Sequence, residues 1–136
     1  SIAGLMTGSI DVLFRVRSGD RHKYFVVDYK SNRLHSPGGK VPHAAYGVDS
    51  MKTAMEHHHY PLQALFYCVA LHRFLSMRVS DYDIDRDLGG AGYLFVRGMV
   101  GGDTPLVNGT RNGVMAWRPS TQVILRINSL LGGEPK

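Results

Sequence analysis

The sequence lacks most features of secreted, membrane or disulfide-rich proteins. It contains a single cysteine, Cys68, so no disulfide can form within the chain, which favours a reducing compartment. No apolar run approaches the ~20 residues that a membrane-spanning helix needs, and no signal peptide is visible. Acidic residues are also scarce, since 11 Asp and Glu stand against 16 Lys and Arg, a formal net charge of +5. We therefore expect a cytoplasmic protein with no membrane span, whose surface attracts polyanions without necessarily binding them.

Length and composition favour one globular domain. With 136 residues, of which 43% are hydrophobic and 20% charged, the chain can bury roughly two thirds of the surface that its unfolded form exposes. We expect a single domain over residues 1–136. The sequence starts at Ser1 without an initiator Met and runs at once into a strand-like pattern, so we expect it to be a fragment of a longer chain.

Residues 8–32 have the pattern of a β-hairpin, because two apolar-rich runs flank a Ser-Gly-Asp turn signal. Paired residues share a face of a sheet, and faces alternate along each strand. A hairpin centred on this turn gathers the large apolar side chains on one face, in the pairs Ile10–Tyr29, Val12–Val27 and Phe14–Phe25.

The other face of this hairpin carries charge. The same register places Asp11 opposite Asp28, with Lys30 beside them. Like charges in directly opposed positions are destabilising, so two carboxylates there need a counter-charge. Mg²⁺ is typically held by one or two carboxylates, and a lysine adds a point charge suited to phosphate. We interpret the three residues as a magnesium site for a phosphate substrate; the alternative is that Asp28 caps a strand end and Asp11 is solvated.

Helical patterns occupy residues 49–56, 60–78 and 119–131. In the longest, Gln63 and Tyr67 are four residues apart and share one face, where they form a polar stripe. The alternative is that Gln63 bonds a loop and Tyr67 only packs.

Ser120 is a suitable N-cap for the last helix. The residues expected to face the core are Leu62, Leu65, Phe66, Val69, Phe74 and Leu75 in the long helix and Val123, Ile124, Ile127, Leu130 and Leu131 in the last.

The remaining segments complete the expected fold. Residues 81–87 are acidic and irregular, residues 91–97 are typical of a buried strand, and residues 114–117 are expected to be a last short strand or an extended segment. The glycine-rich stretch 98–113 is expected to be a mobile connection. The order of elements predicts an α/β sandwich in which helices flank a mixed sheet.

Two segments allow more than one interpretation. The breaker-rich loop at 31–43 is either solvated or, through Arg33 and Lys40, a contact for a DNA backbone. The three histidines at 57–59 invite a zinc site, but consecutive residues do not share a face, so we expect a helix junction instead.

Several motifs together resemble those of the PD-(D/E)XK nuclease superfamily, and most closely its RecB-type nuclease domains. They follow one another in order along nearly the whole chain, as Gly8-x-x-Asp11, Asp28-Tyr29-Lys30-Ser31-Asn32, Tyr60-Pro61-Leu62-Gln63, Gln63-x-x-x-Tyr67, Ala70 to Leu75, and Gly89-Gly90 followed by Tyr93 to Gly98. The resemblance implies a restriction-endonuclease-like core. It also implies an Mg²⁺-dependent exodeoxyribonuclease that can cut endonucleolytically.

The resemblance further implies roles for particular residues and partners. Asp11, Asp28 and the backbone carbonyl of Tyr29 would hold Mg²⁺, Lys30 would orient or activate water and neutralise phosphate charge, Gln63 and Tyr67 would position the strand or the lysine, and His58 could reach the substrate. RecB-type nucleases take a further histidine ligand from an upstream helix, so the site here is expected to be incomplete, with the N-terminal part of the nuclease domain missing. The implied parent is an ATP-driven helicase-nuclease that works with RecC and RecD on single strands during double-strand break repair and recombination. The alternative is a nuclease-fold module that binds DNA or docks a protein without turnover.

Overall fold

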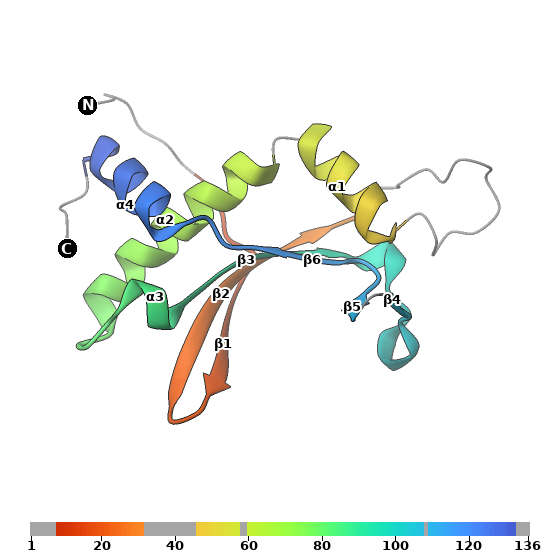
Figure 1. Cartoon of the computed structure of the whole chain (residues 1–136), viewed down its shortest axis with the longest axis horizontal. Coiled ribbons are helices and arrows are strands. Elements are labelled where there is room, and N and C mark those ends of the chain that lie inside the picture. The colour runs from red at the N-terminus through yellow and green to blue at the C-terminus, as the bar shows by residue number, and fades with distance from the viewer. Residues whose placement is uncertain (1–7, 32–45, 58–59, 108, 133–136) are drawn as a thin grey trace.

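A computed structural model describes residues 8–31, 46–57, 60–107 and 109–132. Figure 1 shows strands and helices following one another along the chain. The order is β1 (Val12–Ser18), β2 (Arg21–Lys30), α1 (Val48–His57), α2 (Tyr60–Arg78), α3 (Ile84–Asp87), β3 (Leu88–Phe95), the 3-10 turns η2 (Val96–Gly98) and η3 (Gly101–Asp103), β4 (Leu106–Val107), β5 (Thr110–Arg111), β6 (Val114–Trp117) and α4 (Thr121–Leu130).

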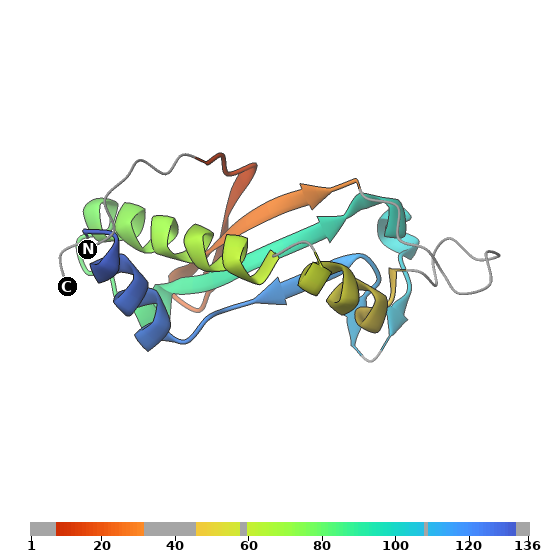
Figure 2. The ribbon, with the colours of Figure 1, turned by 90° about the horizontal axis from the view of Figure 1, so that it is seen from above.

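The main sheet is mixed and has the strand order β1-β2-β3-β6. Strand β2 pairs antiparallel with β1 and parallel with β3, while β3 pairs antiparallel with β6. Helices α1, α2 and α4 lie on one face of this sheet, as Figures 1 and 2 show. The expected α/β class, with a mixed sheet flanked by helices, is therefore confirmed. None of the helices in the described ranges combines the length and the apolar character needed to cross a membrane.

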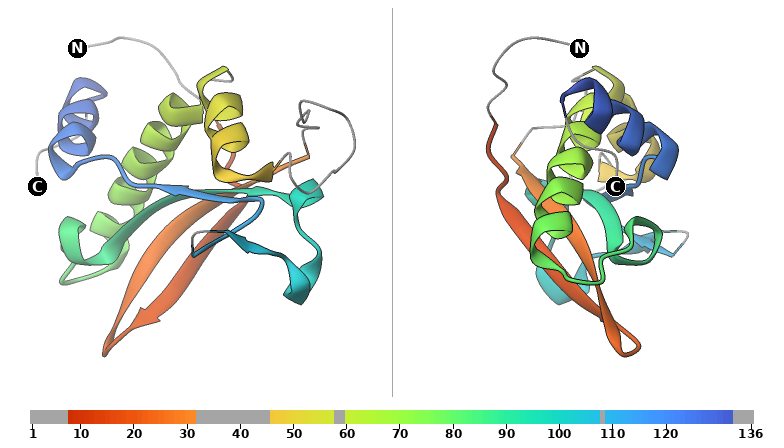
Figure 3. Two further views of the ribbon diagram at one scale, coloured as in Figure 1. Left: turned by 45° about the vertical axis from the view of Figure 1, so that its right-hand side comes forward. Right: turned by 90° about the vertical axis from the view of Figure 1, so that its left-hand side faces the viewer.

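The hairpin forms in the expected register, with Val12 opposite Val27 and Phe14 opposite Phe25. Its turn places Gly19 at φ 63°, in the left-handed region that glycine adopts at little cost. Figure 3 shows the turn of the hairpin extending away from the helices. The alternation of apolar and polar residues was therefore sufficient to predict how the two strands pair.

The helices cover the face of the hairpin that carries the charged residues. Val26 is fully buried and Asp28 is only 6% exposed, whereas Phe14 on the opposite face is 42% exposed. The more apolar face of the hairpin thus points away from the helices. Asp28 lies at the boundary between the sheet and α2, where its charge needs partners from the protein.

Helix α2 begins and ends where the sequence predicted, and its predicted core positions are only partly right: Val69 and Leu75 are buried as expected. Leu62 is 52% exposed and Phe74 40% exposed, so these two expected core positions are wrong. The buried positions are Tyr60, Ala64, Cys68, Val69, Leu71, His72 and Leu75. Small side chains at positions 64 and 68 allow the helix to approach the sheet closely, while Leu62 and Phe74 turn outward.

Several boundaries in the C-terminal half differ from expectation. Strand β3 starts at Leu88 and includes both glycines, and the ring of Phe25 fills the space where a side chain on Gly89 would lie. The short helix α3 and the β4–β5 hairpin fall in segments expected to be irregular or mobile. In α4, the Ser120 hydroxyl caps the helix and Ile124 is fully buried as expected. The expected inward positions Val123 and Leu130 are 44% and 42% exposed, so both are wrong.

A buried carboxylate connects the turn of the hairpin to α3. Asp87 is 2% exposed and accepts hydrogen bonds from the Arg86 guanidinium at 2.8 and 2.9 Å and from the main-chain N–H of Asp83 at 2.9 Å. Arg21 Nε lies 3.8 Å from the same carboxylate. Hydrogen bonding by Arg86 is the main reason why the pKa of Asp87 lies below its usual value.

Candidate active site

Asp28 and Lys30 lie on the helix-covered face of β2, because alternate residues of a strand point the same way. Lys30 Nζ is 2.5 Å from Asp28 Oδ2, and the two side chains are 14% and 8% exposed. A charged pair with so little exposure is only weakly screened by solvent. The predicted closeness of Lys30 to Asp28 is confirmed.

Asp11 reaches the same site from the residue before β1. Its Oδ2 accepts a hydrogen bond from the main-chain N–H of Tyr29 at 3.0 Å. The strand ladder itself starts at the pair Val12–Val27, so Asp11 is not a ladder partner of Asp28. Its carboxylate nevertheless lies at the peptide that joins Asp28 to Tyr29, next to the residue expected to offer a carbonyl ligand.

Helix α2 contributes Gln63 and Tyr67 to the site. Gln63 Nε2 donates to the Tyr67 hydroxyl at 2.9 Å, and Gln63 Oε1 accepts from Lys30 Nζ at 3.3 Å. The Tyr67 hydroxyl lies 2.8 Å from Asp28 Oδ1 and 3.0 Å from the Ser9 carbonyl oxygen. One hydroxyl proton can serve only one of these two acceptors at a time, and the charged carboxylate is the stronger of them. The polar stripe predicted on this helix thus contacts both Asp28 and Lys30 of β2.

Tyr67 lies in an environment that keeps its hydroxyl protonated. Burial raises the pKa of Tyr67 far above its usual value, the hydrogen bond to Asp28 raises it further, and the negative charges of Asp28 and Asp11 add to the shift. Tyr67 is therefore a neutral hydrogen-bond donor at any physiological pH.

The oxygen atoms at this site fit a magnesium ion. Asp28 Oδ2 is buried and accepts no hydrogen bond of normal geometry, although Lys30 supplies a charge beside it. Asp11 adds a second carboxylate beside the peptide that joins Asp28 to Tyr29. Mg²⁺ prefers oxygen ligands and is usually held by one or two carboxylates with water completing its shell. Within the described ranges no cluster of three or more His, Cys, Asp or Glu residues is placed to hold a metal ion, so an ion at this site would rely on two carboxylates, a carbonyl oxygen and water.

Several other predicted contacts lie outside the described residues. Arg33, Lys40, His58 and His59 are among them, so the DNA-backbone contact and the substrate-reaching histidine stay predictions.

Sequence reasoning missed two aromatic residues that surround Lys30. The Lys30 ammonium lies over the rings of Tyr60 and Tyr93. Tyr60 precedes Gln63 by three residues on α2, so helical spacing could have placed both on one side of the helix. Tyr93 could not have been found in this way, because its position depends on the pairing of β3 with β2.

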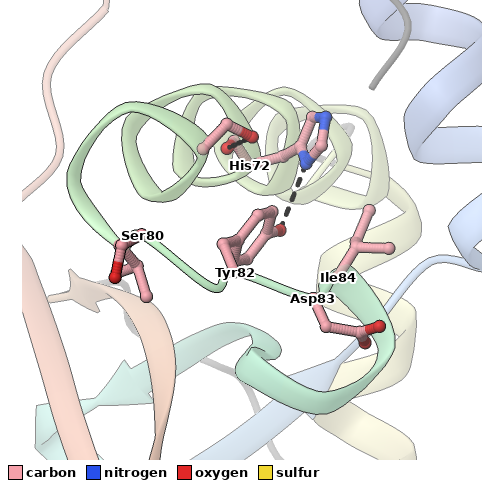
Figure 4. Close-up of a pocket in the computed structure, with 7 residues that line it drawn as sticks. His72, Ser80, Tyr82, Asp83 and Ile84 are labelled. Carbon is pink, nitrogen blue, oxygen red and sulfur yellow. Dashed lines mark hydrogen bonds between the residues drawn. The ribbon is translucent and has the colours of Figure 1, made fainter.

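A separate hollow of about 390 Å³ lies at the other end of α2. Figure 4 shows His72 and Tyr82 pointing toward each other in it, with Ser80, Asp83 and Ile84 around them. His72 Nδ1 and the Tyr82 hydroxyl are 3.1 Å apart. None of the residues of the carboxylate site lines this hollow, so we treat it as a separate feature.

Comparison with known proteins gives the family. The chain is 44% identical over 133 residues to the RecBCD enzyme subunit RecB of Mycolicibacterium smegmatis, a match that covers 98% of this chain and 12% of that protein. It is 45% identical over 130 residues to the RecB subunit of Mycobacterium tuberculosis, covering 96% of this chain and 11% of that protein. The chain belongs to the RecB family. The RecB subunit of Escherichia coli is 35% identical to it over 132 residues, covering 97% of this chain and 10% of that protein.

The chain spans about a tenth of the length of these RecB relatives. Their shared name makes each of them a subunit of a RecBCD enzyme. No protein-family model matches the chain. The resemblance inferred from the motifs is confirmed at the level of the RecB family, since the matched segment covers all the residues of the carboxylate site.

Proposed function

We propose that this RecB-family chain is a metal-dependent nuclease domain that hydrolyses phosphodiester bonds in DNA. The observation that supports this most is the buried Asp28 carboxylate, which has Lys30 Nζ at 2.5 Å on one oxygen and the Tyr67 hydroxyl at 2.8 Å on the other. A purely structural ion pair would not need a second carboxylate, yet Asp11 approaches the same strand. Two carboxylates, a lysine and two positioning side chains suit phosphate chemistry at a divalent cation.

Each residue has a distinct task in this proposal. Asp11, Asp28 and the carbonyl of Tyr29 would hold Mg²⁺, which when bound supplies a water of lowered pKa and stabilises charge on the phosphate. Tyr67 donates to Asp28 Oδ1 and thereby fixes the direction of the carboxylate. The cation would share Asp28 Oδ2 with Lys30 Nζ, which lies 2.5 Å from it. Lys30 places its positive charge where the phosphate develops negative charge.

Gln63 links Lys30 on β2 to Tyr67 on α2. Its amide oxygen accepts from Lys30, and its amide nitrogen donates to Tyr67. Its two ends therefore set the lysine and the tyrosine at a fixed separation. Preorganisation of this kind removes the need to reorient polar groups during the reaction.

The wider biological role is proposed from the RecB relatives. We infer that the chain acts as an exonuclease, also able to cut endonucleolytically, on single strands produced by an ATP-driven helicase. It would work in the bacterial cytoplasm with RecC-like and RecD-like subunits, in double-strand break repair and homologous recombination. The names of the relatives support this role, and the net charge of +5 suits a polyanionic substrate.

Cleavage of end-labelled single-stranded DNA tests the proposal. The full-length RecB-family protein should cut the strand in Mg²⁺ and not in EDTA, and Asp28→Asn in it should abolish cutting. Asp103→Asn is the matched control. It makes the same chemical change at an exposed residue of η3 that lies outside the site. Binding of the strand in EDTA without cleavage in Mg²⁺ would instead support a DNA-binding module that has lost turnover.

A further inference from the structure

The ammonium group of Lys30 rests on an aromatic surface. Lys30 Nζ lies 4.4 Å from the centroid of the Tyr60 ring and 5.4 Å from that of Tyr93. A ring face carries partial negative charge, so it attracts a cation without accepting its proton or competing for a metal. Lys30 therefore has a third kind of partner besides Asp28 and Gln63.

This aromatic surface is rigid. The Tyr60 and Tyr93 rings are stacked with centroids 5.3 Å apart and an interplanar angle of 20°. The Tyr93 hydroxyl donates to the Tyr60 carbonyl oxygen at 2.8 Å, which joins β3 to the first turn of α2. The two residues are 8% and 0% exposed, so neither ring can turn away without disrupting the core.

The aromatic pair also lies directly beside the carboxylate site. Strand pairing places Tyr93 next to Asp28 and Phe95 next to Lys30. Tyr60 is on the same helix as Gln63, three residues earlier. The side chains around Lys30 thus come from α2, which also contacts Asp28 through Tyr67, and from β3, which pairs with β2 beside Asp28.

We propose that Tyr60 and Tyr93 are positioning residues that keep the Lys30 ammonium in place when the Asp28 carboxylate binds a metal ion. Binding of Mg²⁺ to Asp28 would weaken the ion pair between Asp28 and Lys30. The lysine then needs other partners that are not ligands of the metal. The tyrosine rings and the Gln63 amide oxygen are such partners. This inference rests on the proposed nuclease function for its kinetic consequence, but not for its structural one.

The structural consequence is tested by NMR on protein labelled at lysine. A ring beneath the ε-methylene group shifts its resonances upfield, so the Lys30 signal, assigned by its loss in Lys30→Arg, should lie upfield of that of the partly exposed Lys23. Tyr60→Phe should keep this shift, because it keeps the ring. Tyr60→Met should lose most of it, because it fills similar space without a π face. An unshifted Lys30 signal in the wild-type protein would overturn the proposal, and this holds whether or not the protein cleaves DNA.

The kinetic consequence is tested by single-turnover cleavage. Tyr60→Met should lower the rate at saturating DNA by roughly tenfold to a hundredfold, with little change in DNA affinity, and Tyr60→Phe should restore the wild-type rate. In a Lys30→Gln background the same Tyr60→Met change should cost nothing more, because the residue acts through the lysine. If Tyr60→Met lowered the cleavage rate equally in the wild-type and Lys30→Gln backgrounds, Tyr60 would have only a structural role. Absence of cleavage in the wild-type protein would refute the proposed function instead.

Discussion

At the scale of single residues, the site depends on the balance of charge around Asp28. Its carboxylate is almost inaccessible to water, and Lys30 and Tyr67 are the two groups that compensate it in the described part of the chain. Removing a partner from a buried charge costs more than the contact was worth, because the remaining charge stays buried. Changes at Lys30 should therefore affect stability as well as catalysis.

We expect Lys30→Gln to lose most cleavage activity while it keeps its response to Mg²⁺. The lysine is a point charge near the phosphate and not a metal ligand. Without metal the variant should be roughly 1–3 kcal/mol less stable, because the buried carboxylate loses its charged partner. Addition of Mg²⁺ should recover part of this loss, as thermal melts with and without the ion would show.

The control for this prediction is Lys23→Gln, which changes a lysine of the same hairpin outside the site. It should melt and cleave as the wild type does. A Lys30→Gln protein that no longer responds to Mg²⁺ would make the lysine part of the metal site and contradict its assigned role.

At the scale of elements, α2 shows what local pattern can and cannot predict. Its limits, its first-turn proline and the Gln63–Tyr67 stripe followed from spacing and capping chemistry alone. The packed face followed only in part: Val69 and Leu75 are buried as expected, whereas Leu62 and Phe74 are as apolar as any core residue and yet lie outward. Ala64 and Cys68 face the sheet because close approach favours small side chains, a constraint imposed by strands distant in the sequence.

Two substitutions on α2 test the observed orientation. Leu62→Ala should change stability by no more than about 0.5 kcal/mol, because the side chain is 52% exposed. Ala64→Leu should cost about 1–3 kcal/mol, because Ala64 is fully buried and the larger side chain has no space. Denaturant unfolding of both variants gives the comparison. A larger loss of unfolding free energy for Leu62→Ala than for Ala64→Leu would show that Leu62 faces the core, as the sequence suggested.

The link between the hairpin and α3 adds a dependence on pH. Arg86 lowers the pKa of Asp87 in the folded state, with the charge of Arg21 contributing less. A carboxylate with a lowered folded pKa stabilises the protein above its unfolded pKa of about 3.9. This contribution is lost as the pH falls through the lower, folded value. Asp87→Asn should thus cost at least about 1 kcal/mol at pH 7 and weaken the acid sensitivity of folding.

Urea unfolding at neutral and acidic pH measures this effect, with Asp103→Asn as the control. Asp103 is exposed and lies outside the Asp87 cluster, so its variant should follow the wild type at both pH values. If Asp87→Asn and the wild type lost the same stability on acidification, the carboxylate would not be the acid-sensitive link between these elements.

At the scale of the whole molecule, the site is formed where sequence-distant elements meet. The hairpin register could be predicted because both strands are adjacent in the chain and their apolar residues alternate. The cover over Asp28 and the aromatic surface under Lys30 could not, because they require β3 to pair in parallel with β2 and α2 to cross both. The motifs nevertheless identified Asp28, Lys30, Gln63 and Tyr67 as neighbours, and the structure brings all four together.

We propose that Asp11 and Asp28 hold one cation between them. It is tested most directly by the effect of Mg²⁺ on the melting temperature of the wild type, Asp11→Asn, Asp28→Asn and the double variant, at fixed ionic strength. Mg²⁺ should raise the wild-type melting temperature, because an ion that binds only the folded state stabilises it by mass action. Each single variant should lose most of that rise, and the double variant should lose no more than either, because the two residues share one ligand. A full response in either single variant, or losses that simply add, would show that the two carboxylates do not form one metal site.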